Sequence, residues 1–492
     1  MPVCGSAGRI AARSYPQLFA ATRLTQQQPM LLSARRSAIL EEATAMWQLA
    51  WPVLVGQLAT VGMSVADVAM TGHVGADDLA AVSLGASIWS IVLVTVMGFM
   101  MAVNAVVAHE VGAGSLEHIP HIVRQSLWKA LGIGVVACLL TNLAAMIFDH
   151  LGLSTLVHDK ATAFIRIISI GLPPFAAYRV LYGYSTSMNQ TKPVMIIALL
   201  ALLFNIFINW LLVYGHWGLP RMGAVGCAWA STAGLWFMLV AMVWWINRAP
   251  AYRSTTPFTH WERPHWAKVN KMLKLGLPIG ITYFAEVSAF ALVGLLVARF
   301  GVVPISAHQI ALNFSSLVFM VPLSIGIGLM TRVGIAVGEG DPLRARFVAF
   351  VGIGISLTFA VVSAALIVLF RHQIAAAYTS DPAVQAMTVQ LLWLAALFQL
   401  SDATQVAASC AIRGYKVMRQ PMLIQLFAFW GCAIPLGVLL GLAPRWMPWQ
   451  PAAPMQAIGF WIGLVLGLTI AAMLLVVYLN RLSHRRIAAV TI

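Results

Sequence analysis

The sequence predicts an all-α polytopic membrane protein with twelve transmembrane helices in two pseudo-symmetric six-helix bundles. Three observations support this prediction: the composition, a succession of long apolar stretches, and an internal repeat. Of the 492 residues, 60% are hydrophobic and 9% are charged, whereas about 25% of the residues in a soluble domain are charged. The composition therefore excludes an ordinary soluble protein.

Twelve apolar stretches follow one another along the chain, and turn-rich or charged segments separate them. A helix of about 20 apolar residues is long enough to span a bilayer. The predicted spans are 46–72, 79–109, 120–147, 161–182, 192–214, 224–247, 272–298, 306–336, 346–369, 385–412, 422–443 and 457–480.

Basic residues are concentrated in the connections on one side of these spans. With the N-terminus inside, the inner segments hold 23 of the 30 Lys and Arg residues, and the outer loops hold 5. Positively charged connections stay in the cytoplasm, so both termini are expected there. The net charge of +15 comes from short, scattered connections and forms no stripe, so nucleic acid is not an expected partner.

Four residues of the first half recur as the same residue type 226 positions later. The pairs are Pro52 with Pro278, Gly75 with Gly301, Gly112 with Gly338, and Gly114 with Gly340. Each repeat holds six spans, so the two bundles should be related by an axis along the membrane normal. Two similar bundles around a central cleft can rock between states open to opposite sides, which favours a transporter over a channel or a membrane enzyme.

The repeat and the basic connections divide the chain into five expected parts. Residues 1–44 form a cytoplasmic tail that is predicted to be disordered, although a targeting peptide or a later start at Met30 would fit its composition too. The remaining parts are an N-terminal lobe at 45–247, a cytoplasmic connection at 248–271, a C-terminal lobe at 272–480 and a cytoplasmic tail at 481–492.

Three acidic residues lie inside predicted spans: Asp67, Glu286 and Asp402. A charged side chain at the centre of an inserted helix costs about 2.5–3.5 kcal/mol, so these groups must face the bundle interior, a partner or a water-filled cavity. The functional interpretation is that they bind and release H⁺, Na⁺ or an organic cation.

A structural interpretation of the same acids stays open at this point. Each acid could instead form an ion pair between helices, with Arg166, Arg179 or Arg332 as the partner. Each could also simply accept hydrogen bonds from neighbouring spans.

Two pairs of amide side chains give predicted spans a polar face. Asn205 and Asn209 are four residues apart in the fifth span, as are Gln309 and Asn313 in the eighth, so each pair lies on one face of its helix. Amide oxygens can ligate a cation, and the amide nitrogens can donate to a carboxylate. Packing between helices through polar side chains is the competing interpretation.

Aromatic side chains flank one of the buried acids. Tyr283 is three residues before Glu286 and Phe290 is four residues after it. An aromatic face beside a carboxylate is suited to a flat hydrophobic cation through cation–π contact.

Segments in both halves resemble the multidrug and toxic compound extrusion (MATE) family, in particular its NorM-like bacterial branch. The resemblance covers about residues 45–480. The matching segments are WPVLVGQLATVGMSVADVAMTGHVG, LLFNIFINWLLVYGHWGLPRMGAVGCAWA, PIGITYFAEVSAF, AHQIALNFSSLVFMVPLSIGIGLMTRVG and FQLSDATQVAASCAIRGYK.

The resemblance implies an antiporter of the bacterial inner membrane that exports hydrophobic organic cations in exchange for Na⁺ or H⁺. Such a protein is not an enzyme, has no cofactor, and is expected to be a monomer whose partners are the lipid bilayer and small cationic substrates. Asp67, with Asn205 and Asn209 beside it, matches the acid site of the first lobe. Glu286 and Asp402 match the cation-site pair of the second lobe, where Na⁺ could bind.

The resemblance also places Phe290, Gln309 and Asp381 along the drug cavity or its outer edge. The sequence departs from the family pattern at two positions. Phe398 stands where a tyrosine often precedes the acid of the tenth span, which removes a candidate ion ligand, and Thr60 stands where a glutamine is common.

Two other functions fit a helical membrane protein less well. A flippase for lipid-linked sugars on the same scaffold would need a long basic cavity, whereas buried acids outnumber central bases here. A membrane enzyme would need clustered His and acidic residues, and the histidines of this chain are dispersed.

Overall fold

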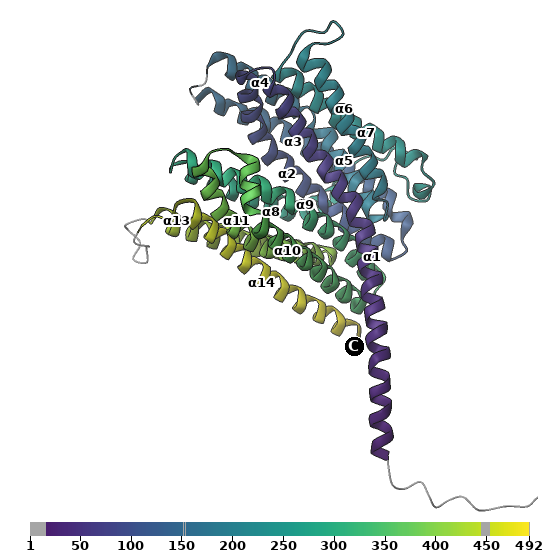
Figure 1. Ribbon diagram of the computed structural model, residues 1–492. Coiled ribbons are helices and arrows are strands. Elements are labelled where there is room, and N and C mark those ends of the chain that lie inside the picture. The colour runs from purple at the N-terminus through teal and green to yellow at the C-terminus, as the bar shows by residue number, and fades with distance from the viewer. Residues whose placement is uncertain (1–15, 151, 153, 444–452, 492) are drawn as a thin grey trace, which may run out of the picture. The chain divides into compact units, whose positions relative to one another are not determined.

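The computed structural model describes residues 16–150, 152, 154–443 and 453–491, and every regular element in these ranges is a helix (Figure 1). Eleven of the described helices are long and apolar enough to span a membrane, and a bent pair brings the number to twelve if it counts as one span. The all-helical polytopic fold is therefore confirmed.

The helices of the first half are α1 (Pro16–Gly72), α2 (Ala76–Gly112), α3 (Ile119–Ala144), α4 (Thr155–Ser169), α5 (Leu172–Ser187), α6 (Lys192–Tyr214) and α7 (Ala224–Arg248). Those of the second half are α8 (Trp266–Ala298), α9 (Val302–Gly338), α10 (Pro342–Tyr378), α11 (Pro382–Gly414), α12 (Arg419–Leu426), α13 (Ile434–Leu442) and α14 (Gln456–Thr491). We call α1–α7 from Met46 onward the N-lobe and α8–α14 the C-lobe.

The chain divides into two compact units, residues 1–45 and 46–492. The helix α1 begins at Pro16, so it extends into the segment 1–44 for which the sequence predicts a disordered tail. This stretch is rich in Ala, Leu, Gln and Arg, which are good helix formers. Residues 1–15 lie outside the described part of the chain.

The predicted span 161–182 consists of two helices, α4 and α5, which meet at an angle of 41°. The break falls at Ile170 and Gly171, directly before the pair Pro173 and Pro174 at the start of α5. Proline lacks a backbone N–H and fits the first turn of a helix but interrupts a helix interior. The proline pair therefore starts a new helix with a new direction.

The two lobes meet where α2 packs against α8 and α9, which lie beside it in Figure 1. Close contact occurs at the ends of α2 and α9 that carry Gly112 and Gly338, where a Cβ on Gly338 would lie 3.0 Å from the Cα of Gly112. We call this end of the helices the crossing end.

A single apolar core joins the lobes in the half of the helices nearest the crossing end. Met100 and Met101 of α2 share this core with Ile279 and Tyr283 of α8 and Ile327 of α9. Toward the opposite end, the apolar clusters of the two lobes are separate. The lobes are therefore packed together at the crossing end.

Candidate functional site

The first candidate site lies in the N-lobe, where α1, α6 and α7 meet around Asp67. Asn209 Nδ2 donates to Asp67 Oδ1 at 2.5 Å, and Ser231 Oγ donates to Asp67 Oδ2 at 2.5 Å. Asn209 also donates to Asn205 Oδ1 at 3.2 Å, and both amide side chains are fully buried. The structure thus brings together Asp67, Asn205 and Asn209, as the sequence predicts, and adds Ser231.

Uncharged donors hold Asp67. Arg179, one of the arginines considered as an ion-pair partner, stacks on Tyr182, with its guanidinium carbon 4.1 Å from the ring centre. No described cation pairs with this half-buried carboxylate. Such a group is suited to attract a cation or to hold a proton.

The second candidate site lies in the C-lobe, where Glu286 of α8 and Asp402 of α11 are close enough to interact electrostatically. Asp402 is only 2% exposed, and its Oδ1 has no hydrogen-bond partner among the described residues. Gln405 lies beside Asp402 and accepts a hydrogen bond from Gln425 of α12. Nearly all buried polar atoms in proteins are hydrogen-bonded, so the free carboxylate oxygen indicates a place for an ion or a proton.

Arg413 is the member of the C-lobe site that sequence reasoning missed. Its side chain is 3% exposed, its guanidinium carbon lies 5.6 Å from the ring centre of Tyr283, and it interacts electrostatically with Glu286. When both carboxylates are ionised, they and the guanidinium carry a net charge of −1. The site therefore lacks one positive charge.

The aromatic candidates occupy two different environments. Tyr283 is buried in the contact between the lobes, where its hydroxyl donates to the sulfur of Met101 at 3.3 Å. Phe290 packs inside the C-lobe, with its ring centre 6.0 Å from those of Phe398 and of Phe429. Phe290 is half-buried, and it lies one turn beyond Glu286 on α8. Phe290 thus packs against the C-lobe core one helical turn from an acid of the pair.

The remaining candidates are not brought to the acids. Gln309 and Asn313 are exposed on α9. Asp381 is exposed at the first turn of α11, where its carboxylate accepts hydrogen bonds from the backbone N–H groups of Ala383 and Val384. Twenty-one helical residues separate Asp381 from Asp402, a rise of roughly 30 Å. Asp381 therefore caps a helix far from the paired acids.

Two helical lobes around buried carboxylates define the class of this protein, a multi-pass membrane transporter. The family model MatE matches the chain twice, at residues 52–211 and 278–439. The protein belongs to this family, the multidrug and toxic compound extrusion transporters.

Curated relatives agree with this assignment. The multidrug resistance protein PmpM of Pseudomonas aeruginosa is 42% identical over 93% of this chain and 95% of its own length. A probable multidrug resistance protein NorM of Chromobacterium violaceum is 41% identical over 92% and 97%, and MdtK of Yersinia pseudotuberculosis is 38% identical over 90% and 96%. All three relatives are named as multidrug resistance proteins.

Solved structures show the same fold at low sequence identity. The eukaryotic MATE transporter AtDTX14 superposes with a TM-score of 0.82 at 19% identity, over 91% of this chain and 98% of that one. An outward-facing multidrug resistance MATE transporter gives a TM-score of 0.80 at 17% identity, over 90% and 96%.

Proposed function

We propose that this protein exports hydrophobic organic cations across a bacterial inner membrane in exchange for Na⁺ or H⁺. The observation that supports this proposal best is the unpartnered carboxylate oxygen of Asp402 beside Glu286 and Arg413. One Na⁺ or one H⁺ neutralises the net charge of −1 that these three groups carry. We therefore expect one monovalent cation to bind at this site in each cycle.

The charge count also explains why ion and drug exclude each other. A cationic substrate supplies the same single positive charge as the coupling ion, so binding both at once would leave an unpaired positive charge in a low-dielectric interior. Binding of the coupling ion at Glu286 and Asp402 then releases the drug. Phe290 lies on the same helix and provides an aromatic face for a flat cation.

The N-lobe site provides a second place for positive charge. Asp67 is partly exposed and fixed by Asn209 and Ser231, so it can hold a substrate cation or a proton. No described contact links it to the C-lobe pair. The two sites act in separate lobes, and the lobes move relative to each other during transport.

Alternating access follows from the way the lobes are packed. With the crossing end closed and both termini in the cytoplasm, the protein is sealed on the cytoplasmic side. Ion binding from outside then allows the lobes to close there and to separate at the crossing end. The ion leaves to the cytoplasm and the next drug molecule enters.

Purified protein in proteoliposomes tests the proposal directly. A fluorescent organic cation such as ethidium is loaded, and either a Na⁺ gradient or a pH gradient is imposed. We expect one of the gradients to drive movement of the dye against its concentration gradient. Dye movement under neither gradient would contradict the proposal, and movement of a lipid-linked sugar instead would identify a flippase.

A further inference from the structure

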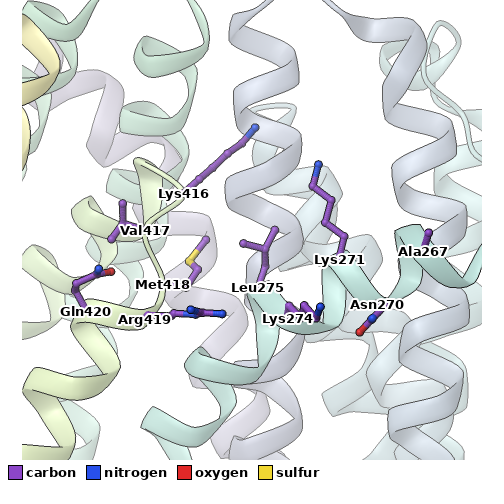
Figure 2. A pocket seen from close by; sticks show the side chains of 10 residues that line it. All are labelled: Ala267, Asn270, Lys271, Lys274, Leu275, Lys416, Val417, Met418, Arg419 and Gln420. Carbon is purple, nitrogen blue, oxygen red and sulfur yellow. The ribbon is translucent and has the colours of Figure 1, made fainter. Parts of the chain in front are cut away.

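A basic pocket lies at the crossing end of the C-lobe, away from both acid sites. The first turns of α8 form one wall and the connection from α11 to α12 forms the other, as Figure 2 shows. The cavity has a volume of about 490 Å³, which lies within the range of small-molecule sites. Four of its ten lining residues are cationic: Lys271, Lys274, Lys416 and Arg419.

No acidic residue lines this pocket. Within the part of the chain whose side chains are described, Lys271, Lys274 and Arg419 form no ion pair, and only Lys416 has an acidic neighbour, Glu110 of α2 at 3.9 Å. Burial, together with the charge of Lys271, lowers the pKa of Lys416. The cations therefore repel one another, and a bound anion would relieve this repulsion.

The fold itself does not require these charges. At an offset of 226 residues, Lys271 and Lys274 correspond to Ala45 and Gln48 of the first repeat. At an offset of 227, Lys416 corresponds to Asn189. Of the four cations, only Arg419 has a basic counterpart, Lys192 at the offset of 227. An α-helical bundle of the same kind thus forms without a basic cluster at the equivalent place.

Lys416 adopts a backbone conformation that lysine rarely occupies. Its φ is 59°, and φ at the equivalent Asn189 is 58°. Asparagine tolerates this left-handed region, whereas a lysine there is strained. Both repeats share this turn conformation, so it belongs to the fold, and the lysine at this position in the second repeat brings a cation to the pocket.

The surroundings place the pocket at the membrane surface. Trp261 and Trp266, next to the start of α8, are 81% and 76% exposed, as expected for tryptophans at the level of lipid headgroups. Leu275 and Met418 give the pocket an apolar side. A ligand with a phosphate and an attached apolar chain fits this combination better than a free phosphate does.

We propose that this pocket binds the phosphate headgroup of an anionic phospholipid, with the start of the lipid chains against Leu275 and Met418. The inner leaflet supplies such lipids, and basic pockets between helices on this side are suited to anionic headgroups. The lipid bridges α8 and the α11–α12 connection. It thereby ties together the two elements of the C-lobe that border the crossing end.

Native mass spectrometry of the purified protein in detergent tests this proposal. The protein is titrated with phosphatidylglycerol or with phosphatidylcholine, and retained lipids are counted. We expect one phosphatidylglycerol to bind at lower concentration than phosphatidylcholine. A triple variant, Lys271→Gln, Lys274→Gln and Arg419→Gln, should weaken that binding on the order of a hundredfold, because each basic side chain contributes about fivefold near an anionic lipid.

A matched triple variant, Lys192→Gln, Arg481→Gln and Arg485→Gln, removes three exposed cations elsewhere and should bind phosphatidylglycerol as the wild type does. Thermal melting of both variants checks that they are folded. Equal lipid binding by the two variants would overturn the proposal. So would displacement of phosphatidylglycerol by millimolar inorganic phosphate, since the ligand would then be a soluble phosphate. The measurement does not depend on transport activity.

Discussion

Gly112 of α2 and Gly338 of α9 pack against each other in a pseudo-symmetric contact. A Cβ on Gly112 would clash with the carbonyl oxygen of Ile335, and a Cβ on Gly338 would clash with the carbonyl oxygen of His109. His109 and Ile335 are themselves 226 residues apart. Each half of the contact therefore repeats the other, as in the isologous interface of a two-fold dimer.

Because the two glycines are in close contact, we predict that a larger side chain at Gly112 opens the crossing end. Gly112→Leu should destabilise the closed arrangement of the lobes by about 1–3 kcal/mol through overpacking. The population with an open crossing end should then rise roughly 5- to 150-fold. Labelling of Cys410 by a water-soluble maleimide measures the shift, because this thiol is buried in the core that joins the lobes. The other cysteines are replaced by serine.

Gly132→Leu is the matched control, since a Cβ at Gly132 meets no atom within 4 Å. It should label at the wild-type rate. If both glycine variants label equally, the contact between α2 and α9 does not hold this end closed.

Lys129 of α3 is a buried cation near the boundary of the lobes. It is 3% exposed, its Nζ donates to the carbonyl oxygen of Phe99 at 3.1 Å, and no described acid pairs with it. An unpaired charge in a protein interior costs several kcal/mol in desolvation. Lys129→Met should therefore raise the melting temperature.

The same variant should slow transport, because the cation destabilises the closed arrangement and becomes hydrated when the lobes separate. Melting curves and dye-efflux rates of Lys129→Met and the exposed control Lys192→Met measure both effects. A melting temperature of Lys129→Met below that of the wild type would refute this account of Lys129.

Glu262 anchors the connection between the lobes to α3. Arg124 Nε donates to Glu262 Oε2 at 2.7 Å, and Trp128 Nε1 donates to the Glu262 backbone carbonyl at 2.9 Å. Burial acts to raise the pKa of Glu262, but the hydrogen bond from Arg124 and the charge of His121 outweigh burial, so the pKa lies below its ordinary value.

A carboxylate with a depressed pKa stabilises the folded protein above its unfolded pKa, and this stabilisation is lost as the pH falls through its folded pKa. Wild type should therefore melt at a higher temperature than Glu262→Gln at neutral pH. This difference in melting temperature should shrink as the pH falls below about 4.5, the ordinary pKa of a glutamate side chain. A difference that stays constant down to pH 3 would show that the Glu262 charge is not the cause.

Asn209 is expected to be essential for the N-lobe site. Asn209→Leu removes the donor to Asp67 Oδ1 and leaves a half-buried carboxylate oxygen without its partner, which costs about 1–3 kcal/mol. Asn313→Leu, on an exposed surface of α9, serves as the control. Thermal melting should separate the two variants, and equal melting temperatures would mean that the hydrogen bond to Asp67 contributes no stability.

The sequence predicts some parts of these sites and not others, for physical reasons. The spacing of Asn205 and Asn209 places both on one helix face, and a buried acid requires donors, so their meeting with Asp67 could be expected. The contact of Ser231 with Asp67 could not be predicted, because a single serine in an apolar helix does not indicate which neighbouring helix it faces.

The sequence also contains a signal that places Arg413 near Asp402. It follows Asp402 by 11 residues, which is three helical turns, so both side chains lie on the same face of α11. Its position next to Gly414 makes it look like one more cation of a cytoplasmic connection. The break between α4 and α5 was similarly encoded by Pro173 and Pro174, but the apolar residues around it hide the change of direction.

Asp→Asn substitutions at two positions of α11 test whether Asp402 carries the coupling charge. Ion-driven efflux of ethidium is measured in proteoliposomes that contain Asp402→Asn or Asp381→Asn. Asparagine caps a helix as well as aspartate does, so Asp381→Asn should transport at the wild-type rate, whereas Asp402→Asn should lose ion-driven efflux while remaining folded. Wild-type efflux by Asp402→Asn would show that Asp402 does not carry the coupling charge.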